Sequence, residues 1–441
     1  WLRDASDPES KLEIYRFRSV LFGSTSSPFI LNAVLKKHLN SYSSTVARDI
    51  MKNIYVDNLV SGVTTPQANA SESNVAVSYF HESNAIMHDA GFKLRSWCTN
   101  DPILRETIAK GGMGLNETTV NVLGLKWDTT ADTLTFPAQP VQPVAVATKR
   151  TVLKLTSALF DPLGLLSPVH IKAKIIIQQL WLDKGEWDAP LNSELDQQWS
   201  SIYADLCLAR NLCIQRHYFD AAFGSPVELH IFCDASDKAY GAAAYLKYQQ
   251  NVALIMSKAR VAPLKEITLP RLELMAALVG VRLAKFIIAS LNAAPLQVVK
   301  TTLWTDSQIT LHWIMCQKKL PVFILNRVKE IRQAKLDSIK HCPGSCNPSD
   351  LLTRGISSYQ LQHSSLWWNG PTWLSQGNND DTQDNIQIYG ALLCVGDECS
   401  AGLHVTSNVV SLTLERSEKA SQISPSSSDI AHNCFWTSSC Y

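Results

Sequence analysis

Four acidic residues in the second half of the chain stand at the ends of predicted elements. Two of them close strands, one opens a helix, and one precedes a leucine pair: Asp234, Asp306, Glu273 and Asp350, respectively. Carboxylates from adjacent strand ends and a nearby helix can hold two hard cations, because Mg²⁺ prefers oxygen ligands and keeps waters or phosphate oxygens besides. Two such ions can activate a water and stabilise a leaving oxygen. The pattern therefore predicts a two-metal hydrolytic site.

Each of these acids, taken singly, also has a plainer interpretation as the cap of a turn or helix. Asp234 and Asp306 are followed by small or hydroxyl residues, as acids between a strand and a turn often are. Asp350 could likewise begin a short helix that runs to Arg354. Residue types alone leave both interpretations open, and only the four acids together favour metal binding.

Other kinds of catalytic site have little support in the sequence. It contains neither a G-x-S-x-G elbow nor a G-x-x-x-x-G-K-[ST] phosphate loop, so serine hydrolases and P-loop nucleotide triphosphatases are disfavoured. Eleven cysteines with no C-x-x-C spacing indicate neither a disulfide scaffold nor a common zinc module. This cysteine usage favours a reducing, intracellular compartment.

The charge balance says little about partners. The formal net charge is +1, which gives no support for binding nucleic acid. Basic residues do gather in one predicted helix, where Arg327 and Arg332 are the candidates for nucleic-acid contacts. A solvated helix face explains that cluster equally well.

The elements around the four acids predict an α/β fold with helices layered on a central sheet. A strand over 228–233 leads into hairpin strands that end at Ser257, and a second strand covers 298–304. Between them, the apolar run 274–291 is interrupted by Arg282 and Lys285, which would be costly in a bilayer. We therefore expect a core helix there, and no membrane partner.

The rest of the chain divides by composition and periodicity. Residues 30–39 have helical spacing, and 54–60 and 120–127 are predicted as strands of a mixed α/β region. Three prolines between 137 and 143 mark a spacer, 149–218 is mostly helical, and the chain after Trp373 turns polar. The predicted parts are 1–136, a helical connector over 137–225, an α/β domain over 226–375, and a flexible tail over 376–441.

Motif strings in the second half resemble the ribonuclease H domain of BEL/Pao-type retrotransposon polyproteins. All four acids fall within them: Phe232-Cys233-Asp234-Ala235-Ser236, Leu269-Pro270-Arg271-Leu272-Glu273-Leu274, Trp304-Thr305-Asp306-Ser307 and Asn347-Pro348-Ser349-Asp350-Leu351-Leu352-Thr353-Arg354-Gly355. The resemblance implies two Mg²⁺ ions, replaceable by Mn²⁺, with Asp234 bridging both, Glu273 and Asp306 holding one and Asp350 the other. Ser236, Ser307 and Gln308 are candidates for contacts to the RNA strand. His341 lies before Asp350, where some ribonucleases H carry a histidine that helps product release, but an exposed loop histidine explains it at least as well.

The first part of the chain resembles the reverse transcriptase palm of the same polyproteins. The resemblance rests on Phe22-Gly23, Ser27-Pro28-Phe29, Tyr55-Val56-Asp57-Asn58, Gly91-Phe92-Lys93-Leu94 and Leu123-Gly124-Leu125. Two departures stand out. The first metal-binding Asp of the polymerase is expected upstream of Trp1, and Asn58 replaces the second Asp of the YxDD turn with a neutral group. We therefore expect this palm remnant, with Asp57 and Asn58, to lack polymerase activity.

The implied function is hydrolysis of RNA in RNA/DNA hybrids, leaving 5′-phosphate and 3′-hydroxyl ends, by a ribonuclease H-type endonuclease. Its partners would be the hybrid, the template-primer and the remainder of the polyprotein, in a cytoplasmic particle or the nucleus. One alternative is an inactive, decayed remnant that binds nucleic acid. Another is an aspartic peptidase, because the connector resembles a peptidase A17-like region, although Asp161 lies in neither an Asp-Thr-Gly nor an Asp-Ser-Gly turn.

Overall fold

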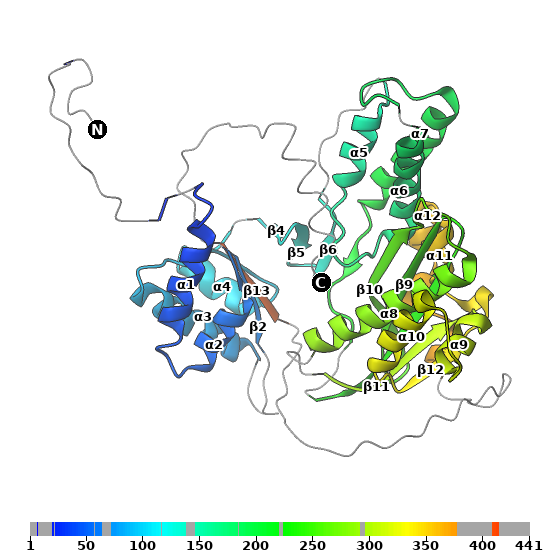
Figure 1. The fold of residues 1–441 in the computed structure, drawn as a ribbon. Coiled ribbons are helices and arrows are strands. Elements are labelled where there is room, and N and C mark those ends of the chain that lie inside the picture. The colour runs from blue at the N-terminus through cyan, green and yellow to red at the C-terminus, as the bar shows by residue number, and fades with distance from the viewer. Residues whose placement is uncertain are drawn as a thin grey trace. The chain divides into compact units, whose positions relative to one another are not determined.

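The computed structural model describes residues 7, 20–21, 23–56, 58–63, 72–115, 117–137, 146–183, 185–219, 224–291, 296–376 and 408–413. The chain divides into two compact units, Trp1–Leu123 with Thr406–Ala420, and Gly124–Val405 with Ser421–Tyr441 (Figure 1). Each unit has a hydrophobic core of its own.

The first unit packs helices on a small antiparallel sheet of order β1-β2-β13-β3. Its elements are α1 (Ser27–Leu39), α2 (Thr45–Asn53), β1 (Ile54–Tyr55), β2 (Asn58–Val63), α3 (Glu72–Asp89), β3 (Arg95–Thr99), α4 (Pro102–Lys110), β4 (Thr119–Val122) and β13 (Asn408–Thr413). Side chains of Ser44 and Asp101 cap α2 and α4. Leu35, Ile50 and Trp97 belong to the core between these elements.

Two strands that we predicted in this region as continuous are broken by turns. The run 54–60 is a hairpin, because Val56 takes a left-handed φ of 53° between β1 and β2. The run 120–127 is interrupted at Leu123 and Gly124, with φ of 47° and 89°. Apolar composition alone does not reveal such breaks, so both predictions of a single strand were wrong. The helix predicted over 30–39 is confirmed as α1.

The second unit contains a five-stranded mixed sheet of order β10-β9-β8-β11-β12. Its strands are β8 (Pro226–Ala235), β9 (Ala239–Tyr248), β10 (Asn251–Val261), β11 (Gln297–Thr305) and β12 (Ser338–His341). The first three form antiparallel hairpins, whereas β11 is parallel to both β8 and β12. The short strands β5 (Leu125–Asp128), β6 (Thr133–Thr135) and β7 (Ile214–Gln215) pair separately.

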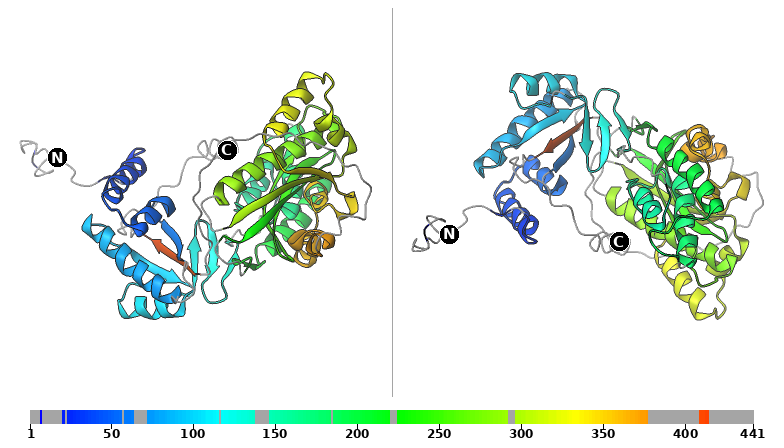
Figure 2. Two further views of the ribbon diagram at one scale, coloured as in Figure 1. Left: turned by 90° about the horizontal axis from the view of Figure 1, so that it is seen from below. Right: turned by 90° about the horizontal axis from the view of Figure 1, so that it is seen from above.

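Helices cover both faces of this sheet, and the views of Figure 2 show the sheet between them. Along β8, side chains alternate between the faces: Ile231 and Cys233 pack toward α8 (Leu269–Leu291), and Phe232 packs on the opposite side. Gly280 lets α8 approach closely, since a Cβ there would lie 3.0 Å from atoms of Ile231 and Leu303. The remaining helices are α9 (Gln308–Met315), α10 (Val322–Gln333), the 3₁₀ turn η1 (Gly344–Cys346), α11 (Asp350–Arg354), α12 (Ser358–His363), α13 (Ser365–Asn369) and α14 (Thr372–Ser375). The predicted α/β class, with helices layered on a central sheet, is confirmed.

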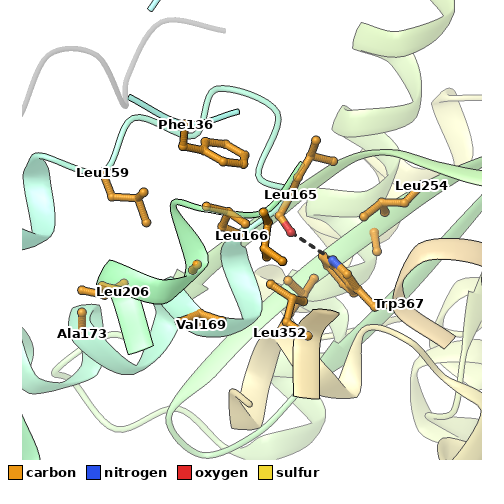
Figure 3. Packing of buried hydrophobic residues seen from close by; sticks show 14 of the residues in the cluster. Phe136, Leu159, Leu165, Leu166, Val169, Ala173, Leu206, Leu254, Leu352 and Trp367 are labelled. Atoms are coloured by element: carbon orange, nitrogen blue, oxygen red, sulfur yellow. Dashed lines mark hydrogen bonds between the residues drawn. The ribbon is translucent and has the colours of Figure 1, made fainter. Parts of the chain in front are cut away.

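The connector is helical, as predicted, and packs against the second face of the sheet. It comprises α5 (Lys149–Ser157), α6 (Ser167–Leu182) and α7 (Ser193–Ala209). The turn before α6 contacts β10, where Ser257 donates to the Gly164 carbonyl over 2.5 Å. The Trp367 indole donates to the Leu165 carbonyl over 3.0 Å (Figure 3). One hydrophobic cluster therefore includes residues of the connector, the sheet and the last helices.

α8 is long and apolar enough to cross a membrane by length and composition, and 56% of its most apolar window is buried inside the protein. It lies against β8, β9 and β11, and its Arg282 leaves the buried face to bind Glu330 of α10 over 2.7 Å. This arrangement is that of the core helix we expected. The tail predicted to be flexible lies mostly outside the described residues, apart from β13.

Candidate active site

The register of two parallel strands brings the first two acids together. Cys233 of β8 pairs with Thr305 of β11, so Asp234, near the end of β8, and Asp306, directly after β11, lie side by side at the carboxyl ends of the two strands. Cys233 also donates to the Trp304 carbonyl over 3.1 Å, which fixes the two strand ends against each other. β8 ends at Ala235 and β11 ends at Thr305, so both strands end within two residues of their predicted ends.

Glu273 joins this pair from the first part of α8. Ligand oxygens of Asp234, Glu273 and Asp306 all lie within 4.8 Å of one another. Two oxygens of the group, Glu273 Oε2 and Asp306 Oδ1, are buried and have no hydrogen-bond partner among the described residues. Buried acceptors without a donor are costly, so this arrangement fits a ligand that supplies positive charge.

Burial raises the pKa values of all three carboxyls, and the charges of neighbouring acids add to the effect. Burial, followed by the charges of Asp234 and Asp306, raises the pKa of Glu273 to about 9. Burial raises the pKa of Asp234 to about 7 despite the hydrogen bond from Thr353, and the charges of Asp306 and Asp350 contribute. The pKa of Asp306 is raised mainly by burial. Without a cation this group retains protons near neutral pH, and cation binding would release them.

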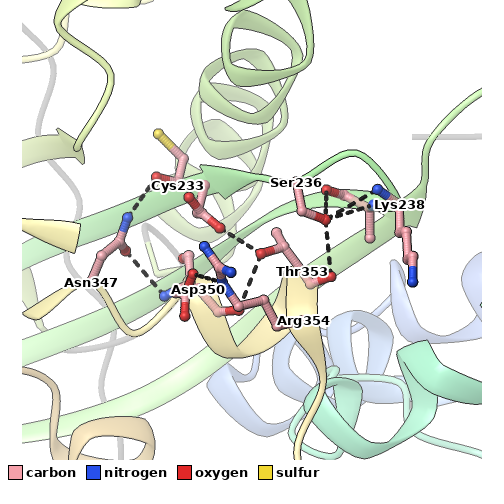
Figure 4. A network of polar contacts seen from close by, with 10 residues as sticks. Cys233, Ser236, Lys238, Asn347, Asp350, Thr353 and Arg354 are labelled. Atoms are coloured by element: carbon pink, nitrogen blue, oxygen red, sulfur yellow. Dashed lines mark hydrogen bonds and ion pairs between the residues drawn. The ribbon is translucent and has the colours of Figure 1, made fainter. Parts of the chain in front are cut away.

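The fourth acid, Asp350, lies beside the three without belonging to their cluster. It is the first residue of α11, and its carboxylate accepts a 2.5 Å hydrogen bond from Nε of Arg354 (Figure 4). Its charge still raises the pKa values of Asp234 and Asp306. The structure therefore separates the four predicted acids into a cluster of three and a neighbouring ion pair.

A polar network fastens the segment that carries Asp350 to the end of β8. Asn347 donates to the Cys233 carbonyl over 3.0 Å, and Ser349 donates to the Phe232 carbonyl over 2.7 Å. Thr353 donates to Oδ2 of Asp234 over 2.5 Å (Figure 4). These three residues are buried, and sequence reasoning assigned them no role. The only signal for them was a run of amide and hydroxyl side chains inside a motif.

The serines and the glutamine predicted to contact RNA are placed at the rim. Ser236 donates to the Thr353 carbonyl over 3.1 Å and accepts the N–H groups of Lys238 and Ala239 in the turn after β8. Ser307 caps α9 by accepting from the backbone of Thr310. Gln308 is exposed. Both serine hydroxyls therefore form hydrogen bonds within the protein, and their contacts to RNA stay predictions.

Both arginines that we predicted as nucleic-acid contacts, Arg327 and Arg332, interact with other residues of the same domain. Arg327 lies 3.5 Å from the centre of the Phe323 ring and donates to Met275 Sδ. Arg332 donates to the Ile314 and Cys316 carbonyls at the end of α9. These contacts hold α10 in place. A nucleic-acid role for either arginine stays a prediction.

Three further predicted residues can be placed. His341 is exposed at the end of β12, paired with Thr305, and its charge lowers the pKa of Asp306. Asn58 begins β2, whereas Asp57 lies outside the described residues. Asp161 accepts backbone N–H groups of Leu165 and Leu166 over 2.9 and 2.8 Å, as expected for a turn acid.

Together, the five-stranded mixed sheet and the clustered acids form an α/β domain with carboxylates at the ends of two neighbouring parallel strands. Residues 148–307, about a third of the chain, match the family described as "Pao retrotransposon-like RNaseH-like domain". That match spans the connector, β8 to β11 and the first three acids. No curated protein matches the chain.

Solved structures that match parts of the chain include ribonuclease H1 of the halophilic archaeon Halobacterium salinarum NRC-1. It has 14% identity and a TM-score of 0.21, over 29% of this chain and 93% of the archaeal chain. A foamy viral protease-reverse transcriptase in complex with double-stranded DNA has 14% identity and a TM-score of 0.41, over 73% of this chain and 59% of the viral one. LC11-RNase H1 in complex with an RNA/DNA hybrid has 12% identity and a TM-score of 0.21, over 29% and 92%.

Proposed function

We propose that the second unit is a divalent-metal-dependent ribonuclease H, which cleaves the RNA strand of RNA/DNA hybrids during reverse transcription of a BEL/Pao-type retrotransposon. The observation that carries the proposal is the convergence of Asp234, Glu273 and Asp306, with two buried oxygens that have no donor in the part of the chain that the structure describes. The match of residues 148–307 to a Pao retrotransposon family supports the biological setting.

The protein's own residues have separable tasks in this proposal. Asp234 would bridge two Mg²⁺ ions, with Glu273 and Asp306 holding one and Asp350 the other. Bound ions of this kind would activate a water and stabilise charge on the scissile phosphate. Thr353 orients Asp234 through its hydroxyl, and the strand register keeps Asp306 beside it. Burial of the cluster strengthens every electrostatic interaction within it.

The first unit is proposed to be the palm remnant of a reverse transcriptase without polymerase activity. Asn58, at the start of β2, has no charge to offer a hard cation. Its partners would be the template-primer and the remainder of the polyprotein, inside the cell in a cytoplasmic particle or the nucleus. Mn²⁺ would substitute for Mg²⁺ in the nuclease, since both accept oxygen ligands.

The test is cleavage of strand-labelled substrates by the full chain in Mg²⁺ or in EDTA. An RNA/DNA hybrid, single-stranded RNA, double-stranded RNA and double-stranded DNA are compared at equal concentration. We expect cutting of the RNA strand of the hybrid in Mg²⁺, and none in EDTA. Cutting of double-stranded DNA at the same rate as the hybrid would contradict the substrate assignment.

The alternative, a decayed remnant that only binds nucleic acid, predicts another outcome in the same samples. Hybrid would be retained in a gel-shift measurement while no strand is cut in Mg²⁺ or Mn²⁺. A cooperative melting transition of the same sample shows that the chain is folded. That combination of results would replace the enzymatic proposal.

A further inference from the structure

Arg354 provides the positive charge in the ion pair that the active site already contains. It lies four residues after Asp350 in α11, so both side chains fall on one face of the helix. Its Nε donates to Asp350 Oδ1 over 2.5 Å, and the charges of Asp234 and Asp306 also raise the pKa of its guanidinium. The guanidinium therefore lies within electrostatic reach of three of the four acids.

The backbone that carries Arg354 is held on both sides. The preceding residue, Thr353, is buried and donates to Asp234. Just beyond the helix, the N–H of Ile356 donates to the Pro168 carbonyl at the start of α6, over 3.1 Å. The arginine side chain itself is 73% exposed. Because the backbone at Arg354 is held in place and its side chain is largely exposed, the guanidinium can move away from Asp350 without any rearrangement of the fold.

The Asp350 carboxylate cannot bind a guanidinium and a divalent cation at full strength at the same time. The bond to Arg354 uses Oδ1, and the carboxylate is 33% exposed, open on the side of solvent. A cation that approaches Asp350 must therefore replace, or share the carboxylate with, the arginine. The three clustered acids face no such competitor, because their only directly bonded donors in the described structure are uncharged.

We propose that Arg354 is a built-in counter-ion that competes with the second divalent cation for Asp350 and thereby weakens that site relative to the three-acid site. The inference rests on the proposed function and adds a positioning residue to it. It implies that the two cation sites fill in order. The three-acid site fills first, and the site at Asp350 fills only as Arg354 swings away.

The test is a calorimetric titration of the full chain with Mn²⁺ alone, without nucleic acid. Wild type is expected to show a tighter and a weaker class of Mn²⁺ site, and Asp350→Asn to lose the weaker class. In Arg354→Gln the weaker class should tighten about two- to five-fold, as expected for removal of an exposed ion pair. The tighter class should not change.

Two further variants separate competition from a general structural effect. Arg354→Lys keeps the charge but loses the planar guanidinium, and should give a smaller shift than Arg354→Gln. Arg150→Gln removes a similar exposed ion pair, with Asp188 of the connector, and should leave both classes unchanged. Melting curves confirm that each variant is folded.

The outcomes distinguish this inference from the proposed function. If wild type binds Mn²⁺ in two classes and Arg354→Gln leaves the weaker one unchanged or makes it weaker, the inference is overturned and the nuclease proposal stands. If the folded wild type binds no Mn²⁺, both are overturned.

Discussion

Replacing Glu273 by glutamine should have opposite effects on stability and on activity. Glutamine keeps the shape of the side chain and removes its charge, and its amide can donate to the neighbouring carboxylates. In the absence of a cation, the change removes the free-energy cost of neutralising an acid that is buried beside the charges of Asp234 and Asp306. In the presence of Mg²⁺, it removes a ligand. The variant should therefore be more stable than wild type in EDTA, and inactive on RNA/DNA hybrid.

The size of the stability effect follows from the pKa of Glu273, which is raised from 4.5 to about 9. At pH 7 this carboxyl is ionised in the unfolded chain and protonated in the folded one. At about 1.4 kcal/mol per pKa unit over the interval from 4.5 to 7, folding loses roughly 3 kcal/mol. For a unit of this size, that corresponds to a rise of about 5–10 °C in the melting temperature of the glutamine variant.

Scanning calorimetry of the full chain at pH 7, in EDTA and in Mg²⁺, measures both halves of the prediction. Wild type should melt at a higher temperature in Mg²⁺, because the ion binds the folded state. Glu273→Gln should melt higher than wild type in EDTA and respond little to Mg²⁺. The control is Glu266→Gln, the same chemical change at an exposed position shortly before α8. A lower melting temperature of Glu273→Gln in EDTA would refute the reasoning.

Three more predictions follow from the site and its supports. In EDTA the free energy of unfolding should fall as the pH rises from about 4 toward 9, because folding raises the pKa values of Asp234 and Glu273 to about 7 and about 9 and the folded state therefore holds protons that the unfolded chain has lost. Urea unfolding at pH 5 and pH 9 measures this loss, and a free energy of unfolding that rises with pH would contradict it. Thr353→Val should lower the rate of hybrid cleavage about 10- to 100-fold, and Thr353→Ser should retain most of it, since the hydroxyl donates to Asp234; equal rates for both variants would argue against this role. Gly164→Ala should destabilise the second unit by more than about 2 kcal/mol in urea unfolding, because φ is +73° and a Cβ would lie 2.2 Å from the Ser257 carbonyl oxygen. An unchanged unfolding midpoint would show that the turn can change conformation to accommodate the Cβ at no cost.

Much of the second unit was predictable because its strands and helix are long and apolar. The strand over 228–233, the helix over 274–291 and the strand over 298–304 correspond to β8, α8 and β11. Acids at the ends of such elements are constrained by register, so the approach of Asp234 to Asp306 could be foreseen from residue order. Each element is two to five residues longer in the structure than in the prediction.

Contacts between segments far apart in the sequence could not be predicted. Nothing in the residue pattern indicates that the turn at Gly164 meets Ser257, or that the connector shares a hydrophobic cluster with the sheet. The same limit applies to Thr353, whose role depends on a partner 119 residues away. The hydrogen bonds of Arg327 and Arg332 to other parts of the domain depend on how the helices pack, which the charge pattern of the sequence does not describe. The predicted domain boundaries and the RNA contacts stay predictions.

The most direct test of the central claim is the initial rate of RNA cleavage in a hybrid by the full chain in Mg²⁺. Wild type is compared with Asp306→Asn and with Asp237→Asn, the same change at an exposed residue in the turn after β8. We predict that wild type and Asp237→Asn cut the RNA strand at similar rates, and that Asp306→Asn, which folds normally, does not. Equal rates for all three would show that the clustered carboxylates are not a nuclease site.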